Sequence, residues 1–370
     1  MTPTIDQCRR AASAAPADRA MRLIADGVLD RDGPTGLARR VGCPADQLDP
    51  LLRAEFGAGA AKLADAHRTE LEHLARPGGA DPDVITVELP YRPPYDAAAM
   101  WRFLAARAIA GLEELAGPVY RRALRLPRGP GVAELTPANG HVVGAFRLAD
   151  RRDLAPAVAR SRRLLHLDAD PDRVTETLGA DPLLGPLVRA RPGLRVPGSA
   201  DPYEIAVRAI IGQQVSVSAA RTVAGRMVGA YGTPLPVPVG GITHTFPTPQ
   251  TLAEVPQLPM PRSRVRTITA LATAVADATI DLEFGADWTA AVPALLAFPG
   301  IGSWTAEYVA LRGLGDPDAF PGTDLGIRYA LVDLGVPDHG RTISDLADRW
   351  RPLRSYAAQY LWTHLGDRGG

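Results

Sequence analysis

The stretch Leu295–Ala310 reads LLAFPGIGSWTAEYVA, and it decides how the chain around it folds. An apolar helix ends at Phe298, and the glycines of Pro299–Gly302 permit a tight turn with positive φ. We expect Ser303 to be the N-cap of a second helix, because its hydroxyl can accept a backbone N–H. The stretch predicts a helix, a hairpin and a helix whose free N–H groups could hold a phosphate. Taken alone, the stretch favours a plain helical hairpin with a glycine turn over a phosphate site.

A second stretch, Asp316–Arg328, follows closely and reads DPDAFPGTDLGIR. Its Pro/Gly loop delivers Thr323 and Asp324 to the start of a new helix. A helix N-terminus favours an ionised carboxylate. Asp324 is therefore either a simple N-cap or a fixed negative charge available for chemistry.

Further segments accompany these two in a fixed order along the chain. They are PPYD at 93–96 with FLAARA at 103–108, ARPGLR at 190–195, AIIGQQVSV at 209–217, FPTPQ at 246–250 and WRPLRSYA at 350–357. Together the segments resemble the helix-hairpin-helix DNA glycosylase superfamily, and within it the 3-methyladenine DNA glycosylase II family. The resemblance covers about residues 84–367.

The resemblance implies a mostly helical fold with a small α+β domain, that is, an antiparallel sheet domain plus two helical subdomains. The sequence pattern agrees: a strand at 84–89, a helix at 97–114, and a hairpin through Asn139-Gly140 between two apolar runs. The pattern predicts a Pro/Gly loop at 232–248 and a single helix at 303–313. We divide the chain into 1–82, 83–162 and 163–370, with a linker at 76–83 and the helix-hairpin-helix at 290–314.

The N-terminal segment has two short helical patterns about Gly42. They resemble the first helix-turn-helix of an AraC-type domain, such as the one in Ada-type alkylation-response proteins. The second of these helices begins at Pro44, presents Asp46 and Asp49 where DNA phosphates would lie, and is interrupted by Pro50. We expect a packing remnant rather than a DNA-reading element.

By resemblance, Asp324 matches the catalytic aspartate of the family. The implied reaction is hydrolysis of the N-glycosidic bond of alkylated purines, of the 3-methyladenine and 7-methylguanine type, after base flipping in base excision repair. Cleavage of this bond develops positive charge on the deoxyribose, which a nearby carboxylate stabilises, or the carboxylate orients water, or both. The alternative is a non-catalytic DNA-damage-binding or alkylation-response regulatory protein.

The flipped base needs flat apolar surface, and a cationic methylated purine gains about 0.5 to 2 kcal/mol from each aromatic face. Core packing is the competing interpretation of each aromatic residue. Trp304 and Tyr308, four residues apart, lie on one helix face, and by resemblance Trp362, Phe103 and Leu325 complete the predicted base pocket. Leu325 stands where some relatives have a bulkier residue, which would widen the pocket. By resemblance, Gln214 is the wedge that fills the gap, and the other predicted DNA contacts are Gly300, Gly302, Ser303 and Thr305 at the hairpin.

Lysine usage separates two reaction types. Of 41 basic residues only Lys62 is a lysine, and Trp304 occupies the position where strand-nicking relatives carry a Schiff-base lysine. The sequence therefore predicts a monofunctional glycosylase without lyase activity. Two cysteines cannot hold a four-cysteine iron–sulfur cluster.

Composition excludes other classes. The 370 residues are 46% hydrophobic and 22% charged, with no apolar run long enough for a membrane helix and no signal peptide, so we expect a cytoplasmic protein. Net charge is zero, but residues 101–200 sum to +6 and contain the basic runs Arg121–Arg128 and Arg151–Arg163, either a DNA-binding stripe or a solvated face. The expected partner is double-stranded DNA with alkylated bases, bound by a monomer, with no membrane partner.

No cofactor is expected to be required. By resemblance, a structural monovalent cation could bind the hairpin through the backbone carbonyls of Leu296, Phe298 and Gly300.

Overall fold

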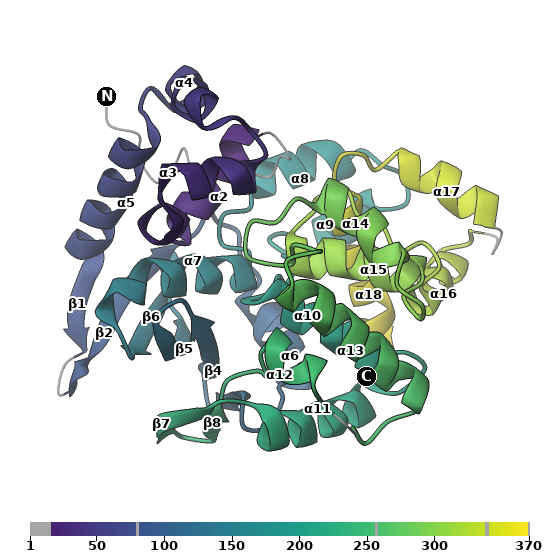
Figure 1. The fold of residues 1–370 in the computed structure, drawn as a ribbon. Coiled ribbons are helices and arrows are strands. Elements are labelled where there is room, and N and C mark those ends of the chain that lie inside the picture. Colours follow the sequence, from purple (N-terminus) through teal and green to yellow (C-terminus); the bar gives the residue numbers. More distant parts are fainter. Residues whose placement is uncertain (1–15, 79–80, 256–257, 337–339, 369–370) are drawn as a thin grey trace.

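The computed structural model describes residues 16–78, 81–255, 258–336 and 340–368 (Figure 1). A small antiparallel sheet lies on one side of the molecule and helices make up most of the rest. The predicted fold class, mostly helical with a small sheet domain, is confirmed. None of the helices in the described part of the chain is long and apolar enough to cross a membrane.

The N-terminal helices share their own core of buried apolar side chains. They are α2 (Pro16–Ala25), α3 (Val28–Val41), α4 (Ala45–Phe56) and α5 (Ala60–Leu74). Gly42 ends α3 with φ 81°, which confirms two short helices around a tight glycine turn. A buried ion pair ties this unit to the sheet domain: Arg160 Nε lies 2.8 Å from Asp26 Oδ1, and Asp26 is 1% exposed.

The sheet has the strand order β1-β2-β6-β5-β4-β3, with every neighbouring pair antiparallel. Its strands are β1 (Ala75–Gly78), β2 (Asp81–Pro90), β3 (Glu113–Ala116), β4 (Val119–Leu126), β5 (Gly129–Pro137) and β6 (His141–Leu148). The predicted Asn139-Gly140 hairpin joins β5 to β6. Helices α5, α6 (Ala97–Arg107) and α7 (Leu154–Leu165) share one core with the sheet.

The structure corrects the sequence prediction at two places that were expected to lack regular structure. The stretch 76–83 contains β1 and the start of β2, with Ala75 opposite Val87, instead of a free linker. The expected loop at 232–248 contains the hairpin of β7 (Pro234–Val239) and β8 (Ile242–His244). Proline and glycine mark turns, but they also occur in short edge strands, where a missing N–H donor costs no ladder bond.

The remaining helices form two cores. The first contains α10 (Pro202–Ile211), α11 (Val217–Tyr231), α12 (Pro249–Ala253), α13 (Arg262–Ala276), α14 (Trp288–Leu296) and α15 (Ser303–Tyr308). The second contains α8 (Pro171–Leu178), α9 (Gly185–Ala190), α16 (Leu325–Asp333), α17 (Gly340–Asp348) and α18 (Arg354–Arg368). The predicted helix at 303–313 is present, but its second half is a π-helix, η2 (Val309–Leu314), which continues directly from α15.

Candidate active site

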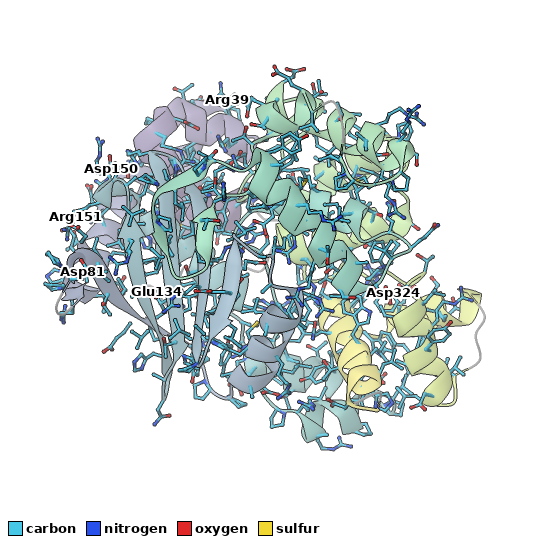
Figure 2. The ribbon with its side chains drawn as sticks, turned by 90° about the horizontal axis from the view of Figure 1, so that it is seen from below. Arg39, Asp81, Glu134, Asp150, Arg151 and Asp324 are labelled. Atoms are coloured by element: carbon cyan, nitrogen blue, oxygen red, sulfur yellow. The ribbon has the colours of Figure 1, made fainter. Side chains whose placement is uncertain are left out.

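Asp324 is the N-cap of α16, at the end of the loop that follows η2. Its Oδ1 accepts hydrogen bonds from the backbone N–H of Ile327 at 3.0 Å and from Trp362 Nε1 at 2.9 Å. Its Oδ2 accepts from Trp304 Nε1 at 2.6 Å. In Figure 2, Asp324 lies on the side of the molecule away from Asp81 and Asp150, which mark the sheet domain. Three N–H donors from three different segments therefore fix both oxygens of this carboxylate.

The loop that carries Asp324 is itself anchored on both sides. Glu307 of α15 accepts the backbone N–H of Phe320 at 3.0 Å, and burial raises the pKa of Glu307. Ser355, at the start of α18, donates to the backbone oxygens of Asp316 at 2.6 Å and Ala319 at 3.0 Å. Sequence reasoning missed Glu307 and Ser355 as supports. Their anchoring means that Asp324 does not depend on a free loop for its position.

Aromatic rings surround the carboxylate. Trp304 and Tyr308 stack with centroids 5.2 Å apart, and Tyr308 meets Trp362 edge-on at 6.3 Å. A cavity of about 790 Å³ is lined by Phe103, Trp304, Tyr308, Asp324 and Trp362, among others. The structure thus brings together four of the five predicted pocket residues with the predicted catalytic one.

The fifth predicted pocket residue is placed differently. Leu325 is 61% exposed and is not among the residues that line the cavity. It lies on the outer surface of α16 with Tyr329 and Val332, which are also exposed. Its role in the pocket stays a prediction.

Two arginines that sequence reasoning missed also line the cavity. Arg312 is 3% exposed, donates to Pro197 O at 2.8 Å, and lies over the rings of Phe103 at 4.4 Å and Trp362 at 5.3 Å. Arg107 lies 4.0 Å from the Phe103 ring. Burial lowers the pKa of Arg312 to about 10, so it remains protonated at neutral pH. The ring of Phe103 therefore already contacts two guanidinium groups, those of Arg107 and Arg312.

A signal for Arg312 was present in the sequence. Trp304, Tyr308 and Arg312 are spaced four residues apart, which places them on one helix face. The same spacing relates Phe103 to Arg107. A pocket prediction based on aromatic residues alone does not include either arginine.

The hairpin depends on one glycine in particular. Gly300 has φ 90°, and a Cβ there would lie 2.4 Å from Thr267 Oγ1. Gly302, in extended backbone, is the N-cap of α15 without a side-chain hydrogen bond, and Ser303 is the first helical residue. The prediction of Ser303 as N-cap is therefore wrong by one residue. Gly302 and Ser303 are exposed, and no atom lies within 4 Å of a Cβ built on Gly302, so the N-terminus of α15 is open.

Two glutamines occupy the turn between α10 and α11, and one of them links this turn to the hairpin. Gln214 is exposed and has φ 56°, so it protrudes from this turn as a wedge residue would. Its neighbour Gln213 donates from Nε2 to Gly300 O at 2.9 Å and to Thr305 Oγ1 at 3.0 Å. Thr305 is 2% exposed, backbone included, so the structure does not place it at the surface as the predicted DNA contact. Sequence reasoning missed Gln213, which joins the two elements predicted to contact DNA.

Two of the three backbone carbonyls predicted to hold a cation accept a hydrogen bond within the protein. Phe298 O accepts the N–H of Ile301 at 3.1 Å and Gly300 O accepts from Gln213. A carbonyl oxygen has two lone pairs, so each retains one for an ion. Oxygen ligands of this kind suit a hard cation.

The basic run Arg121–Arg128 is used inside the protein rather than on a DNA-facing stripe. Arg122 is 3% exposed and bonds Glu113 at 3.3 Å and Glu204 of α10 at 2.8 Å. Burial alone would raise the pKa of Glu113, but Arg208 and Arg122 hold it below its ordinary value. The other pairs are Arg121 with Glu114 and Glu134, Arg125 with Asp201, and Arg128 with Asp153. Arg122 and Arg125 thereby fasten the sheet to α10, and Arg128 fastens it to the start of α7, whereas the pairs of Arg121 lie within the sheet.

Comparison with known proteins agrees with this geometry. Residues 86–201 match the family model described as the AlkA N-terminal domain. A Mycobacterium tuberculosis protein named "Probable bifunctional transcriptional activator/DNA repair enzyme AlkA" is 45% identical, over 94% of this chain and 80% of its own length. The "DNA-3-methyladenine glycosylase 2" of Escherichia coli is 37% identical, over 74% of this chain and 95% of its own.

Solved structures share the fold at lower identity. The 3-methyladenine DNA glycosylase of Archaeoglobus fulgidus superposes with a TM-score of 0.65 at 21% identity, over 75% of this chain and 98% of its own. The 8-oxoguanine glycosylase/lyase of Clostridium acetobutylicum, solved with double-stranded DNA, gives 0.59 at 19% identity, over 78% of this chain and 97% of its own.

Proposed function

The chain belongs to the AlkA family of DNA-3-methyladenine glycosylases, and from this premise we propose that it hydrolyses the N-glycosidic bond of alkylated purines in duplex DNA. Family membership makes it a DNA repair glycosylase. The substrate class, the flipping of the base and the absence of lyase activity are the proposal. The observation that carries the proposal is the carboxylate of Asp324, fixed by three N–H donors at the wall of an aromatic cavity.

The proposed reaction proceeds on a base that has left the duplex and entered the cavity, at an unstacking cost of a few kcal/mol. The bond from C1′ to the base nitrogen breaks, and the base departs with the electron pair. Asp324 stabilises the positive charge that develops on the sugar, or orients the water whose oxygen bonds C1′, or both. A cationic methylated purine leaves as a neutral base, so the reaction needs no general acid.

The stacked pair Trp304 and Tyr308 is the proposed platform for the base. Aromatic faces attract a cationic base. Arg107 and Arg312 act in the opposite sense, since both are cations that line the same cavity. Asp324 supplies the compensating negative charge. The balance of these charges would favour a base at the Trp304 side of the cavity over one beside Phe103.

Backbone N–H groups at the hairpin, rather than lysine side chains, are proposed to bind the DNA phosphates. The open N-terminus of α15, at Gly302 and Ser303, supports a phosphate contact. Gln214 is the proposed wedge. We further propose that the protein acts as a monomer, needs no cofactor, and holds at most a structural monovalent cation at the carbonyls of Leu296, Phe298 and Gly300.

Monofunctionality is proposed because a Schiff base requires an unprotonated amine beside C1′. Trp304 occupies the relevant position and bonds Asp324 through its indole. Lys62 lies on α5 of the N-terminal unit and does not line the cavity. The expected product is therefore an intact strand with an abasic site.

The test is base release from duplex DNA treated with a methylating agent, followed by chromatography of the free bases. We expect 3-methyladenine and 7-methylguanine to be released, and nothing from untreated DNA. The product strand should break only after alkali, and borohydride should trap no enzyme–DNA adduct. A folded protein that releases no base, under conditions where a related enzyme does, would refute the activity. A trapped adduct at Lys62 or at the N-terminal amine would refute monofunctionality alone.

The regulatory alternative draws support from the name of the Mycobacterium tuberculosis relative and from the helices around Gly42. The exposed start of α4 opposes it, because Pro44, Ala45, Asp46 and Gln47 offer DNA no positive charge. Duplex DNA binding by the full chain that depends only on the glycosylase domain, and not on the N-terminal unit, fits the proposal. Sequence-specific binding abolished by changes in α4 would favour the regulator.

A further inference from the structure

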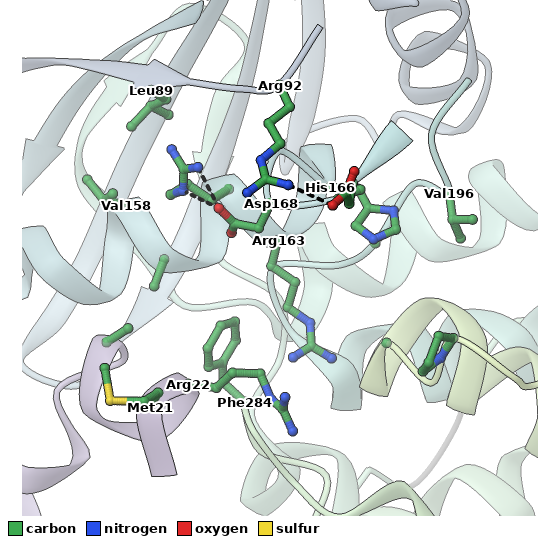
Figure 3. Close-up of a pocket in the computed structure, with 18 of the residues that line it drawn as sticks. Met21, Arg22, Leu89, Arg92, Val158, Arg163, His166, Asp168, Val196 and Phe284 are labelled. Carbon is green, nitrogen blue, oxygen red and sulfur yellow. Dashed lines mark hydrogen bonds and ion pairs between the residues drawn. The ribbon is translucent and has the colours of Figure 1, made fainter. Parts of the chain in front are cut away.

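A second cavity, of about 450 Å³, lies where the N-terminal helices, the sheet domain and the helical domain meet (Figure 3). Helices α2 and α5 line one side, β2 and α7 another, and the segment from Leu311 to Pro317 a third. None of the three residues that donate to Asp324 lines it. The reaction proposed above makes no use of this cavity.

Two arginines from different domains enter this cavity together. Figure 3 shows Arg22 of α2 and Arg163 of α7 pointing into the same part of it, beside the ring of Phe284. The Arg163 guanidinium lies 4.9 Å from that ring and donates one hydrogen bond to Gly313 O. Within the described residues, Arg163 forms no ion pair with a carboxylate, and its Nε has no hydrogen-bond partner.

The positive charge of Arg163 is poorly compensated. Burial, together with the charge of Arg22, lowers the pKa of Arg163 to about 9, and burial lowers that of Arg22 to about 10. Asp18 and Asp287 attract Arg22, and Asp26 attracts Arg163, but none of these carboxylates lines the cavity. A buried cation without a counter-charge is costly, so an anion placed beside Arg163 would be favoured, and Arg22 brings a second guanidinium to the same part of the cavity.

The carboxylates that do line the cavity are occupied or turned elsewhere. Asp168 bonds Arg162, and Asp170 bonds Arg92 at 2.6 Å. Asp316 accepts the backbone N–H of Asp318 at 2.8 Å, and the charges that act on it are those of Asp318 and Arg354. Glu88 is exposed at the surface. None of them neutralises Arg163.

The rest of the wall suits an organic body attached to the anion. Apolar and aromatic side chains line it, namely Met21, Leu89, Val158, Val196, Phe284 and Tyr356. The volume lies in the range of small-molecule sites, well beyond what a lone inorganic anion fills. A few polar groups in a mostly apolar cavity are the usual composition of such sites.

We propose that this cavity binds a phosphate monoester with an aromatic or apolar body, its phosphate held between Arg22 and Arg163. Two guanidinium groups match a dianion, and the planar fork of arginine bonds phosphate oxygens in pairs. The body of the ligand lies against Phe284 and the apolar wall. The ligand would join the N-terminal unit to the glycosylase domains at a site separate from Asp324.

The test is isothermal titration of the full chain, without DNA, with phenyl phosphate, inorganic phosphate and phenol. We expect one site for phenyl phosphate with a Kd below about 1 mM, weaker binding of inorganic phosphate, and none of phenol. Arg163→Gln and Arg22→Gln should each weaken phenyl phosphate binding at least about tenfold. Arg39→Gln, the same change of charge on an exposed arginine of α3, should leave it unchanged.

Arg163 also holds Gly313, so a measurement on the wild-type protein accompanies the variants. Hydrogen exchange with saturating phenyl phosphate should show protection in α2, in α7 and around Phe284. Protection confined to the hairpin at 299–304 would assign the binding to the DNA-phosphate site and overturn the proposal. So would absent binding, equal binding by Arg163→Gln, or phenol binding as tightly as phenyl phosphate.

Discussion

Replacing Asp324 by asparagine tests the proposed chemistry most directly, because it keeps the shape of the side chain and removes its charge. The structure also says which contact is lost. The Oδ1 position accepts two donors, Ile327 N–H and Trp362 Nε1, whereas the Oδ2 position accepts one, Trp304 Nε1. The amide oxygen should therefore take the Oδ1 position, and the amide nitrogen should face the indole N–H of Trp304, donor against donor.

Two effects of different size follow. A hydrogen bond to a charged group contributes about 1.5–3 kcal/mol, so loss of the Trp304 bond should lower the free energy of unfolding by an amount of that order. Loss of the charge acts on the transition state, where removal of an electrostatic contact typically costs roughly 10²-fold or more in rate. Binding of the DNA should survive, because the proposed phosphate contacts are at the hairpin.

The assay is single-turnover release of methylated base at saturating enzyme, with DNA affinity and urea unfolding measured on the same preparation. Asp333→Asn, near the other end of α16 and bonded to His364, is the matched control and should release base at the wild-type rate. An Asp324→Asn protein that keeps more than half of the wild-type rate would refute the catalytic role. A rate loss that merely follows loss of DNA binding would make the role structural.

Three further predictions concern the hairpin, the domain contact and the histidines. Gly300→Ala should reduce DNA affinity and lower Tm, because the residue has φ 90° and the new Cβ would lie 2.4 Å from Thr267 Oγ1. Gly302→Ala should change Tm little, because no atom lies within 4 Å of a Cβ there. Equal changes in Tm for the two variants would contradict this account of the hairpin. Asp26→Ala should cost about 3–5 kcal/mol in urea unfolding because it leaves Arg160 buried and unpaired, against less than about 1 kcal/mol for the exposed Asp65→Ala. Burial lowers the pKa of His67 and His166 to about 4 from an ordinary 6.5, so the unfolded chain binds more protons and stability should fall as pH drops from 7 toward 4; a double glutamine variant with the same slope would show that other groups dominate.

Local pattern was enough to predict much of the fold. The helix-hairpin-helix and the position of Asp324 at a helix start both depend on residues within a dozen positions of one another, so the sequence displays them directly. The Asn139-Gly140 hairpin and the glycine turn at Gly42 belong to the same class. The misplaced N-cap shows the limit even here, because Gly302 and Ser303 are both acceptable caps and the local pattern does not choose between them.

Features that depend on distant partners were not predictable in this way. The strand β4 was missed because its arginines suggest a solvated surface until their carboxylate partners, such as Glu204 on α10, are known. The strand β3 was missed because the predicted helix at 97–114 ran into it, whereas α6 ends at Arg107. The bond from Trp362 to Asp324 spans 38 positions and depends on how α18 packs against α16. Arg312 was predictable as a pocket residue, since helical spacing already places it beside Tyr308.

The tryptophans are distributed so that each cavity has its own optical reporter. Trp304 and Trp362 donate hydrogen bonds to Asp324, and Trp288 lines the second cavity, which contains Arg22 and Arg163. Trp101 and Trp350 lie in separate cores and are 7% and 0% exposed. A base that enters beside Asp324 disturbs the first pair of indoles, and a ligand beside Arg22 disturbs the indole over which that guanidinium lies at 5.3 Å. Replacing Trp288 by phenylalanine would leave emission that responds to the base cavity alone. Intrinsic fluorescence can therefore follow the two occupancies separately in the unlabelled protein.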